Sequence, residues 1–212
     1  MLVRASGALR RVLLRGLRLG GQAKRLSGEG AATADCFPLS RGLLRLQGPE
    51  VETFLQGLLT NDVTRLAAVG GASDAPRALY AHALNVQGRC LYDVILYRIH
   101  ESPREEPHIL LECDATVLDS LQKHLKLYKI RRKVNISPCL DLSLWALIPK
   151  ELSEDVSHKF QQCAGKAVVV TPDPRVDVMG WRLITSKDTD PLEIIPGSQI
   201  GEIKDYHRHR HP

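Results

Sequence analysis

Residues 78–99 read ALYAHALNVQGRCLYDVILYRI and carry the clearest secondary-structure signal in the chain. Two segments rich in aliphatic and aromatic residues, 78–85 and 89–99, are joined across Asn85-Val86-Gln87-Gly88. Turn-forming residues between two such segments are typical of a β-hairpin. The sequence therefore predicts an antiparallel pair of strands here.

Around this hairpin, helical and extended patterns follow one another without regular alternation. Helices are expected at 49–59, 115–128 and 151–163 from their 3.6-residue apolar period. Strands are expected at 37–46, 109–113, 142–148, 166–171 and 181–185, and residues 129–136 lead into another. Because regular βαβ units are missing, we expect an α+β fold with mixed, largely antiparallel sheets and packed helices.

Two of these helices have recognisable starts, and the segments between elements have their own signals. Pro49 suits the first turn of a helix, and Asp114 is a good N-cap for the helix that follows it. Residues 67–77, rich in Ala, Gly, Ser and Pro, are expected to form a flexible loop. Residues 205–212 read as the start of a helix at which the sequence stops.

Asp93 interrupts the otherwise apolar and aromatic run of residues 90–97. A buried carboxylate needs a hydrogen-bonding partner, a cation or a ligand. Strand alternation also permits Asp93 to face solvent as a structural residue, so both interpretations stay open. We expect it to face a polar pocket near Asn61 and Asn85.

The basic run Lys129-Ile130-Arg131-Arg132-Lys133 also has two interpretations. Cations that follow a helix complement the negative end of its dipole. Alternatively, Arg131 or Arg132 clamps a carboxylate through paired hydrogen bonds.

Residues 1–28 contain seven Arg and Lys residues and no carboxylate, with leucines between them. Such an Arg-rich, acid-free amphipathic segment is typical of a mitochondrial presequence. The other interpretation is a disordered or nucleic-acid-binding basic tail. We expect a presequence at 1–28 and a small-residue linker at 29–36.

Composition excludes several function classes for the rest of the chain. Without the seven cations of residues 1–28, 22 Lys and Arg remain against 24 Asp and Glu, a net charge of −2. We therefore expect no nucleic-acid partner, since such a partner needs a basic surplus. No apolar run approaches the length of a membrane span, so we expect no membrane-spanning segment.

The five cysteines (Cys36, Cys90, Cys113, Cys139 and Cys163) are scattered along the sequence, so no tightly bound metal is expected. Cys90 and Cys113 are expected to be small core residues.

Three segments together resemble a known family: residues 57–63 (GLLTNDV), 84–95 (LNVQGRCLYDVI) and 125–134 (LKLYKIRRKV). They look like the folate-binding aminomethyltransferase-like superfamily, and are most similar to its YgfZ-type branch. Two further segments match that branch, DPR at 173–175 with MGWR at 179–182, and DYH at 205–207. The resemblance runs in the same order from about residue 37 to 211.

This resemblance implies the amino-terminal portion of the aminomethyltransferase (T-protein) fold over residues 37–212, incomplete at its C-terminal end. It implies a mitochondrial matrix protein that assists late 4Fe–4S cluster assembly with A-type scaffold proteins. A tetrahydrofolate-type ligand is implied too. The residues that would line its site are Asn61, Asn85, Arg89, Asp93 and Arg131, with Asp93 at the pterin edge and Arg131 at the glutamate tail.

Two departures from the family pattern bear on catalysis. Aminomethyltransferases of the glycine cleavage system carry an acidic pair where this chain has Tyr92-Asp93. The YgfZ-type branch also has a downstream Lys-Gly-Cys-Tyr-x-Gly-Gln-Glu motif, followed by a β-barrel. The resemblance places both beyond residue 212, where this sequence ends. We therefore favour a non-catalytic assembly factor, assign no catalytic residue, and keep a folate-dependent one-carbon transferase as the alternative.

Overall fold

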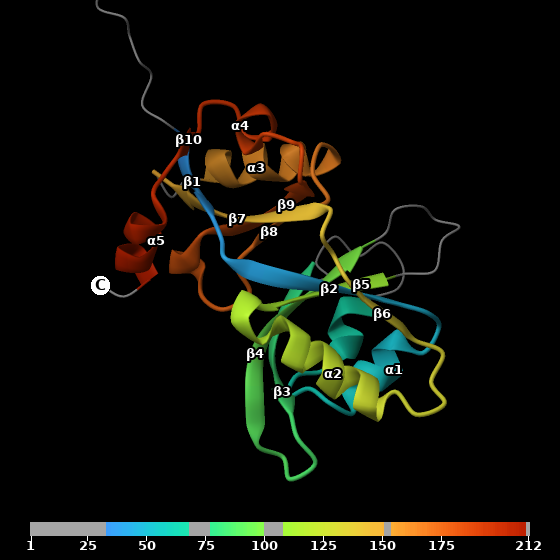
Figure 1. The fold of residues 1–212 in the computed structure, drawn as a ribbon. Helices are drawn as coiled ribbons and strands as arrows, with labels where there is room; N and C mark the ends of the chain where they lie inside the picture. Colours follow the sequence, from blue (N-terminus) through green and yellow to red (C-terminus); the bar gives the residue numbers. More distant parts are fainter. Residues whose placement is uncertain (1–32, 68–76, 100–107, 151–153, 211–212) are drawn as a thin grey trace, which may run out of the picture.

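The computed structural model describes residues 33–67, 77–99, 108–150 and 154–210. The expected presequence and almost all of the loop expected at 67–77 lie outside these residues. The described residues form an α+β structure with two five-stranded sheets, shown one above the other in Figure 1. The expected fold class is confirmed, because every strand pair is antiparallel except β1 with β10.

Sheet A has the strand order β10-β1-β7-β9-β8, and sheet B the order β3-β4-β5-β2-β6. The strands of sheet A are β1 (Ala34–Pro38), β7 (Leu142–Pro149), β8 (Val169–Pro172), β9 (Trp181–Ser186) and β10 (Gln199–Ile200). Those of sheet B are β2 (Arg41–Gln47), β3 (Ala78–Leu84), β4 (Cys90–Ile99), β5 (His108–Asp114) and β6 (Asn135–Pro138). The hairpin predicted from residues 78–99 is confirmed as β3 and β4, in which His82 is the partner of Asp93.

Five α-helices lie on or beside these sheets in the described part of the chain. They are α1 (Val51–Gln56), α2 (Leu118–Tyr128), α3 (Glu154–Gln162), α4 (Pro191–Ile194) and α5 (Ile203–Arg210). The predicted N-cap is confirmed, since Asp114 accepts a hydrogen bond from the Thr116 backbone N–H at 2.9 Å. It caps a short 3₁₀ turn, Ala115–Val117, from which α2 continues.

Three apolar clusters define the order of the layers. The first joins one face of sheet B to α1 and α2, and includes Leu46, Leu55 and Leu121. The second contains residues of both sheets, such as Ile95 and Ile184, so the sheets pack face to face. The third joins the far face of sheet A to α3 and α4. The layers therefore run α3/α4, sheet A, sheet B, α1/α2, with the helices outside (Figure 1).

Three expectations need correction. The single strand expected at 37–46 is two strands, β1 and β2, which belong to different sheets. Residues 34–36, expected in a linker, are part of β1, where Ala34 and Cys36 are fully buried. Cys90, expected in the core, is exposed because the first residues of β4 extend past the apolar cluster towards the turn.

The remaining elements follow the expected positions with shorter ends. The helix expected at 49–59 is regular only over Val51–Gln56, with Glu50 as its N-cap residue. No helix among the described residues is both long and apolar enough to cross a bilayer.

Candidate functional site

A chain of charged side chains crosses the space between the two sheets. Its centre is Arg182 on β9, whose side chain is 1% exposed and points towards sheet B. The Arg182 Nε atom lies 2.9 Å from Asp173 Oδ2, and its Nη1 atom lies 3.2 Å from Glu112 Oε1. One guanidinium group therefore links a carboxylate of sheet B to the loop that follows β8.

On the sheet B side, Glu112 has two further partners. The Tyr97 hydroxyl donates a short hydrogen bond to Glu112, and Arg41 forms a close ion pair with it. Arg41 also reaches Asp93, with Nη2 and Oδ2 separated by 3.4 Å. Because the Asp93 side chain is 36% exposed, the charged chain runs from the buried interface out to solvent.

On the sheet A side, the charged chain continues to a residue of α5. Arg175 donates from Nε and Nη2 to the two oxygens of Asp173, at 2.9 and 2.7 Å. Its Nη2 atom lies 3.5 Å from the hydroxyl of Tyr206, a buried residue of α5. Asp173 therefore holds two arginines, and Arg175 connects the chain to the C-terminal helix.

Burial and neighbouring charges shift the pKa values of two side chains in the charged chain, Asp173 and Tyr97. Burial raises the pKa of Asp173, but the hydrogen bonds and positive charges of Arg175 and Arg182 outweigh it and hold this pKa below its ordinary value. Burial, together with the negative charge of Glu112, raises the pKa of Tyr97 well above its ordinary value. The carboxylate of Asp173 therefore stays charged at neutral pH, while the hydroxyl of Tyr97 stays protonated.

A shallow cavity of about 270 Å³ lies next to the charged chain. It is lined by Asn61, Arg65, Ala78, Leu79, Tyr80 and Pro174, the last of which follows Asp173. The Asn61 side-chain amide donates to the backbone oxygen of Tyr80 at 2.9 Å, which places it against β3. The Tyr80 hydroxyl lies 3.3 Å from His82 Nε2, and His82 pairs with Asp93 across the two strands. Asn61, Tyr80, His82 and Asp93 therefore form one polar surface at the outer end of the charged chain.

Two of the expected site residues are used to build the hairpin turn. The Asn85 side-chain oxygen accepts hydrogen bonds from the backbone N–H groups of Gln87 and Arg89, at 3.0 and 2.9 Å. The Arg89 side chain is exposed. Asn85 therefore has a local structural role that its position in the turn explains.

Arg131 lies in a different layer from Asp93. It follows α2, which packs on the face of sheet B away from sheet A, and it is exposed with a positive φ of 59°. The Glu50 carboxylate, which precedes α1, accepts hydrogen bonds from the Arg132 side chain and from the Lys133 backbone N–H. Among the expected site residues, the described contacts bring Asn61 and Asp93 to one surface and leave Arg131 on the other side of the sheet.

Asp93 has a polar partner of the kind that the sequence predicted, Arg41, but the sequence analysis did not identify the rest of the charged chain. Glu112 interrupts an apolar strand just as Asp93 does, so the same signal applies to it. Asp173, Arg175 and Arg182 lie in the segments that carry the family resemblance, yet no role was expected for them. Their contacts join residues far apart in sequence, which a local pattern does not reveal.

The cysteines form no cluster with other potential metal ligands. No group of three or more His, Cys, Asp or Glu residues that could hold a metal occurs within the described ranges. Burial raises the pKa of Cys113 to about 12 and that of Cys139 to about 11, so both are thiols at neutral pH. Cys163 is half-buried and lines a separate pocket beside α3.

Sequence comparison finds several curated relatives, although no protein-family model matches. The human protein named iron-sulfur cluster assembly factor IBA57, mitochondrial, is 49% identical over 184 residues, covering 86% of this chain and 51% of the human protein. The mouse protein of the same name is 42% identical over 210 residues, covering 98% of this chain and 57% of its own length. A homologue from Neurospora crassa is 32% identical over 178 residues.

Among solved structures, glycine cleavage system aminomethyltransferase T from Bartonella henselae aligns with a TM-score of 0.49 and 16% identity, over 74% of this chain and 43% of that chain. The three relatives above are all named as mitochondrial proteins, in agreement with the mitochondrial localisation expected from residues 1–28. The chain is therefore a homologue of the mitochondrial iron–sulfur cluster assembly factors named IBA57, and it spans about half the length of the human and mouse proteins.

Proposed function

We propose that this protein takes part in mitochondrial iron–sulfur protein maturation, in the matrix. The observation that carries the proposal is the identity of 49% with a human protein named as an iron–sulfur cluster assembly factor. The seven-to-zero excess of cations over carboxylates in residues 1–28 supports the same compartment. The proposed step is late 4Fe–4S cluster assembly, in which an A-type scaffold protein is the partner and the cluster is cargo.

The partner proposal can be tested with the purified chain. We expect it to bind a 4Fe–4S-loaded A-type scaffold protein and to speed cluster transfer to an apo-aconitase, measured as recovered aconitase activity. The same transfer reaction with an unrelated protein in place of the chain serves as the control. No binding to the A-type scaffold, or no change in the transfer rate, would contradict the proposal.

We also propose that a tetrahydrofolate-type ligand binds at the polar surface around Asn61 and Asp93. The support is that Asn61 lines a cavity, while Asp93 is part-exposed and, within the described part of the chain, forms an ion pair with Arg41 alone. Asn85 and Arg89 extend this surface towards the hairpin turn, and Arg131 is the proposed contact for a glutamate tail. Because Arg131 lies across sheet B, that contact requires the tail to pass around the sheet edge.

Asp93 gives the sharpest test of the ligand. We expect Asp93→Ala to weaken binding of a reduced folate, measured by calorimetry, at least tenfold. Its melting temperature should change little, because Arg41 keeps its ion pair with Glu112. Asp141→Ala is the matched control, since Asp141 also has a single arginine partner, Arg45, at 3.3 Å. Equal folate affinity in the wild type and Asp93→Ala would remove Asp93 from the site.

The same preparation distinguishes an assembly factor from a folate-dependent one-carbon transferase. A transferase consumes a methylene or aminomethyl donor with multiple turnovers, whereas an assembly factor changes cluster transfer without such consumption. We expect no consumption of methylene-tetrahydrofolate. Sustained turnover would establish the transferase instead.

A further inference from the structure

A second cavity lies on the opposite side of sheet A from the charged chain. It has a volume of about 440 Å³ and is lined by Thr33, Lys159, Phe160, Gln162, Cys163, Lys166, Ile195 and Pro196. We call it the α3 pocket. Since α3 and α4 cover the outer face of sheet A, this pocket is separate from the polar surface around Asn61 and Asp93.

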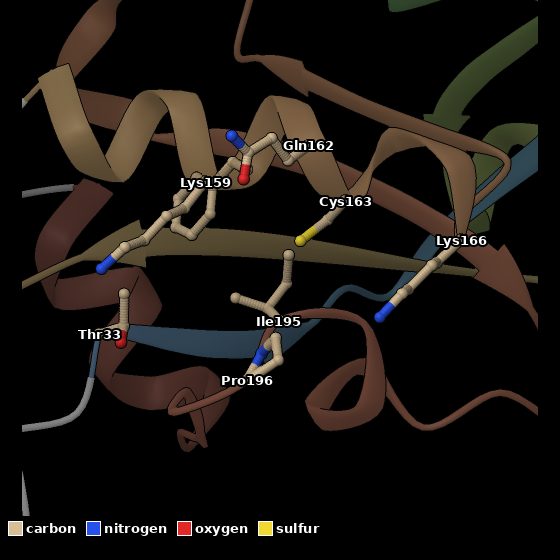
Figure 2. A pocket seen from close by; sticks show the side chains of 8 residues that line it. Thr33, Lys159, Gln162, Cys163, Lys166, Ile195 and Pro196 are labelled. Carbon is tan, nitrogen blue, oxygen red and sulfur yellow. The ribbon is translucent and has the colours of Figure 1, made fainter.

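One side of the α3 pocket is built by the end of α3 and the 3₁₀ turn that follows, Cys163–Gly165. Lys159, Cys163 and Lys166 are spaced four and three residues apart, so they share one side of this helical segment. Figure 2 shows the Cys163 sulfur between the two lysines, with the Lys159 ammonium on the side of Thr33 and the Lys166 ammonium at the opposite end of the pocket. Phe160 turns inward and packs on Trp181 with ring centroids 5.4 Å apart, which gives the pocket an apolar floor.

The opposite side is held by backbone hydrogen bonds. The Ile195 N–H donates to Pro191 at 2.9 Å, and the Thr33 N–H donates to Gly197 at 2.7 Å. Gly197 has a φ of 80°, and a Cβ atom there would lie 2.9 Å from the Thr33 hydroxyl oxygen. Pro196 and the close approach of Thr33 to Gly197 therefore restrict the backbone conformation of this side of the pocket. The cavity is thus formed before any ligand enters.

The charge of the α3 pocket has one sign. Among the residues that the structure describes, its lining contains two ammonium groups and no carboxylate. Within the described ranges, neither Lys159 nor Lys166 forms an ion pair with an acidic side chain. The dipole of α3 favours cations at its last turn wherever their side chains point. It does not explain why these two lysines border an apolar cavity that also has the Thr33 hydroxyl and the Gln162 amide in its lining.

We propose that the α3 pocket binds a small amphipathic organic anion, a carboxylate on an aliphatic body. The carboxylate accepts a charge-assisted hydrogen bond from one of the two lysines at the rim, and the positive charge of the other lysine adds to the attraction. The aliphatic part packs on Phe160, Ile195 and Pro196, and it covers the Cys163 thiol. The volume falls within the range of pockets that hold small ligands.

Cys163 gives a direct readout of this binding in the full chain. Iodoacetamide alkylates each accessible thiolate with loss of iodide, and peptide mass spectrometry follows Cys163 and the exposed Cys90 separately. We expect saturating octanoate to slow alkylation of Cys163 about tenfold and to leave Cys90 unchanged. Octan-1-ol, which has a similar chain without the charge, should protect Cys163 far less.

Charge recognition is tested with Lys159→Gln/Lys166→Gln. We expect this variant to need at least tenfold more octanoate for half-protection, because a hydrogen bond to a charged group is worth about 1.5 kcal/mol or more. Lys187→Gln is the matched control, since Lys187 is exposed beyond the end of β9 and away from the pocket. Equal melting temperatures of the three proteins exclude misfolding as the cause.

Two results would overturn the proposal. The first is unchanged alkylation of Cys163 at millimolar octanoate, which would show that no such anion binds. The second is equal protection by octanoate and octan-1-ol, or equal protection in the wild type and the double lysine variant. That result would show an apolar cavity that does not recognise charge.

Discussion

Arg182 joins the two sheets through buried ion pairs. It is almost fully buried and binds carboxylates that come from different layers, Glu112 of sheet B and Asp173 of the loop after β8. Burying a guanidinium is costly unless its partners satisfy it, whereas removing it leaves two buried carboxylates with one fewer cation. The stability of the interface should therefore depend on this single side chain.

Replacing Arg182 with Met tests this directly. We expect a loss of about 3 kcal/mol in the free energy of unfolding, since Arg41 and Arg175 still neutralise part of the remaining charge. Urea denaturation monitored by tryptophan fluorescence measures it. Arg208→Met is the control, because the Arg208 side chain is 79% exposed and should contribute less than about 0.5 kcal/mol. Equal stability of the two variants would contradict the assigned role.

Asp173 gives the molecule a defined sensitivity to acid. Its pKa is lowered in the folded state from an ordinary value of 3.8. The resulting stabilisation is complete above the unfolded-state pKa, and it is lost as the pH falls below about 4 through the folded-state pKa. Protonation of Asp173 then removes the carboxylate partner of Arg175 and leaves Arg182 with Glu112.

We therefore expect Asp173→Asn to be less stable than the wild type at pH 6, with a smaller difference at pH 3. Unfolding in urea at both pH values gives the comparison. Asp188→Asn is the control, because it removes an exposed carboxylate outside the charged chain. A constant difference between wild type and Asp173→Asn from pH 6 to pH 3 would show that Asp173 does not titrate with folding.

At the scale of elements, one glycine, Gly180, permits the chain to enter β9. Gly180 immediately precedes β9 with φ 67° and ψ −126°, a conformation that residues with a Cβ atom rarely adopt. A Cβ atom there would lie 2.2 Å from the backbone oxygen of Leu147 on β7. Gly180 therefore permits β9 to enter sheet A next to β7 and to place Arg182 towards sheet B.

Replacing Gly180 with Ala should cost at least about 3 kcal/mol, since backbone strain and a backbone clash add together. Thermal unfolding followed by circular dichroism is sufficient to detect a change of this size. Gly165→Ala is the matched control, because a Cβ atom at Gly165 would meet nothing within 4 Å. A melting temperature for Gly180→Ala close to that of Gly165→Ala would contradict this account.

At the scale of the whole molecule, charge is divided between the first 28 residues and the rest. The first segment carries seven cations, and the remainder has a net charge of −2. A negative-inside membrane potential acts on such a cationic segment, whereas the remainder has no comparable surplus. Mitochondrial targeting should therefore depend on the first segment alone.

We expect residues 1–28 fused to a fluorescent reporter to direct it to mitochondria. The full chain with Arg10, Arg11, Arg15 and Arg18 all changed to Glu should remain in the cytosol. Changing the same four residues to Lys is the control, since it keeps the positive charge. Fractionation of cells that express each variant measures the outcome, and mitochondrial import of the Glu variant would disprove the prediction.

Local sequence determined the elements whose signals lie within a few residues. The β3–β4 hairpin was predictable because the turn residues 85–88 separate two apolar segments, and Asp114 was predictable as a cap because its partner is two residues away. The presequence expected at 1–28 rests on composition alone. The family resemblance agrees with the curated relatives, since sequence similarity requires no knowledge of the contacts.

Only the tertiary structure decided how these pieces meet. The division of residues 34–47 between two sheets was not predicted, because it depends on pairing with strands distant in sequence, β1 with β7 and β2 with β5. The charged chain joins Arg41, Glu112 and Arg182, and the α3 pocket joins Thr33 to Cys163 and Ile195. Such groups come together because sheet packing buries residues distant in sequence, and their charges and cavity exist only once both sheets and their helices are in place.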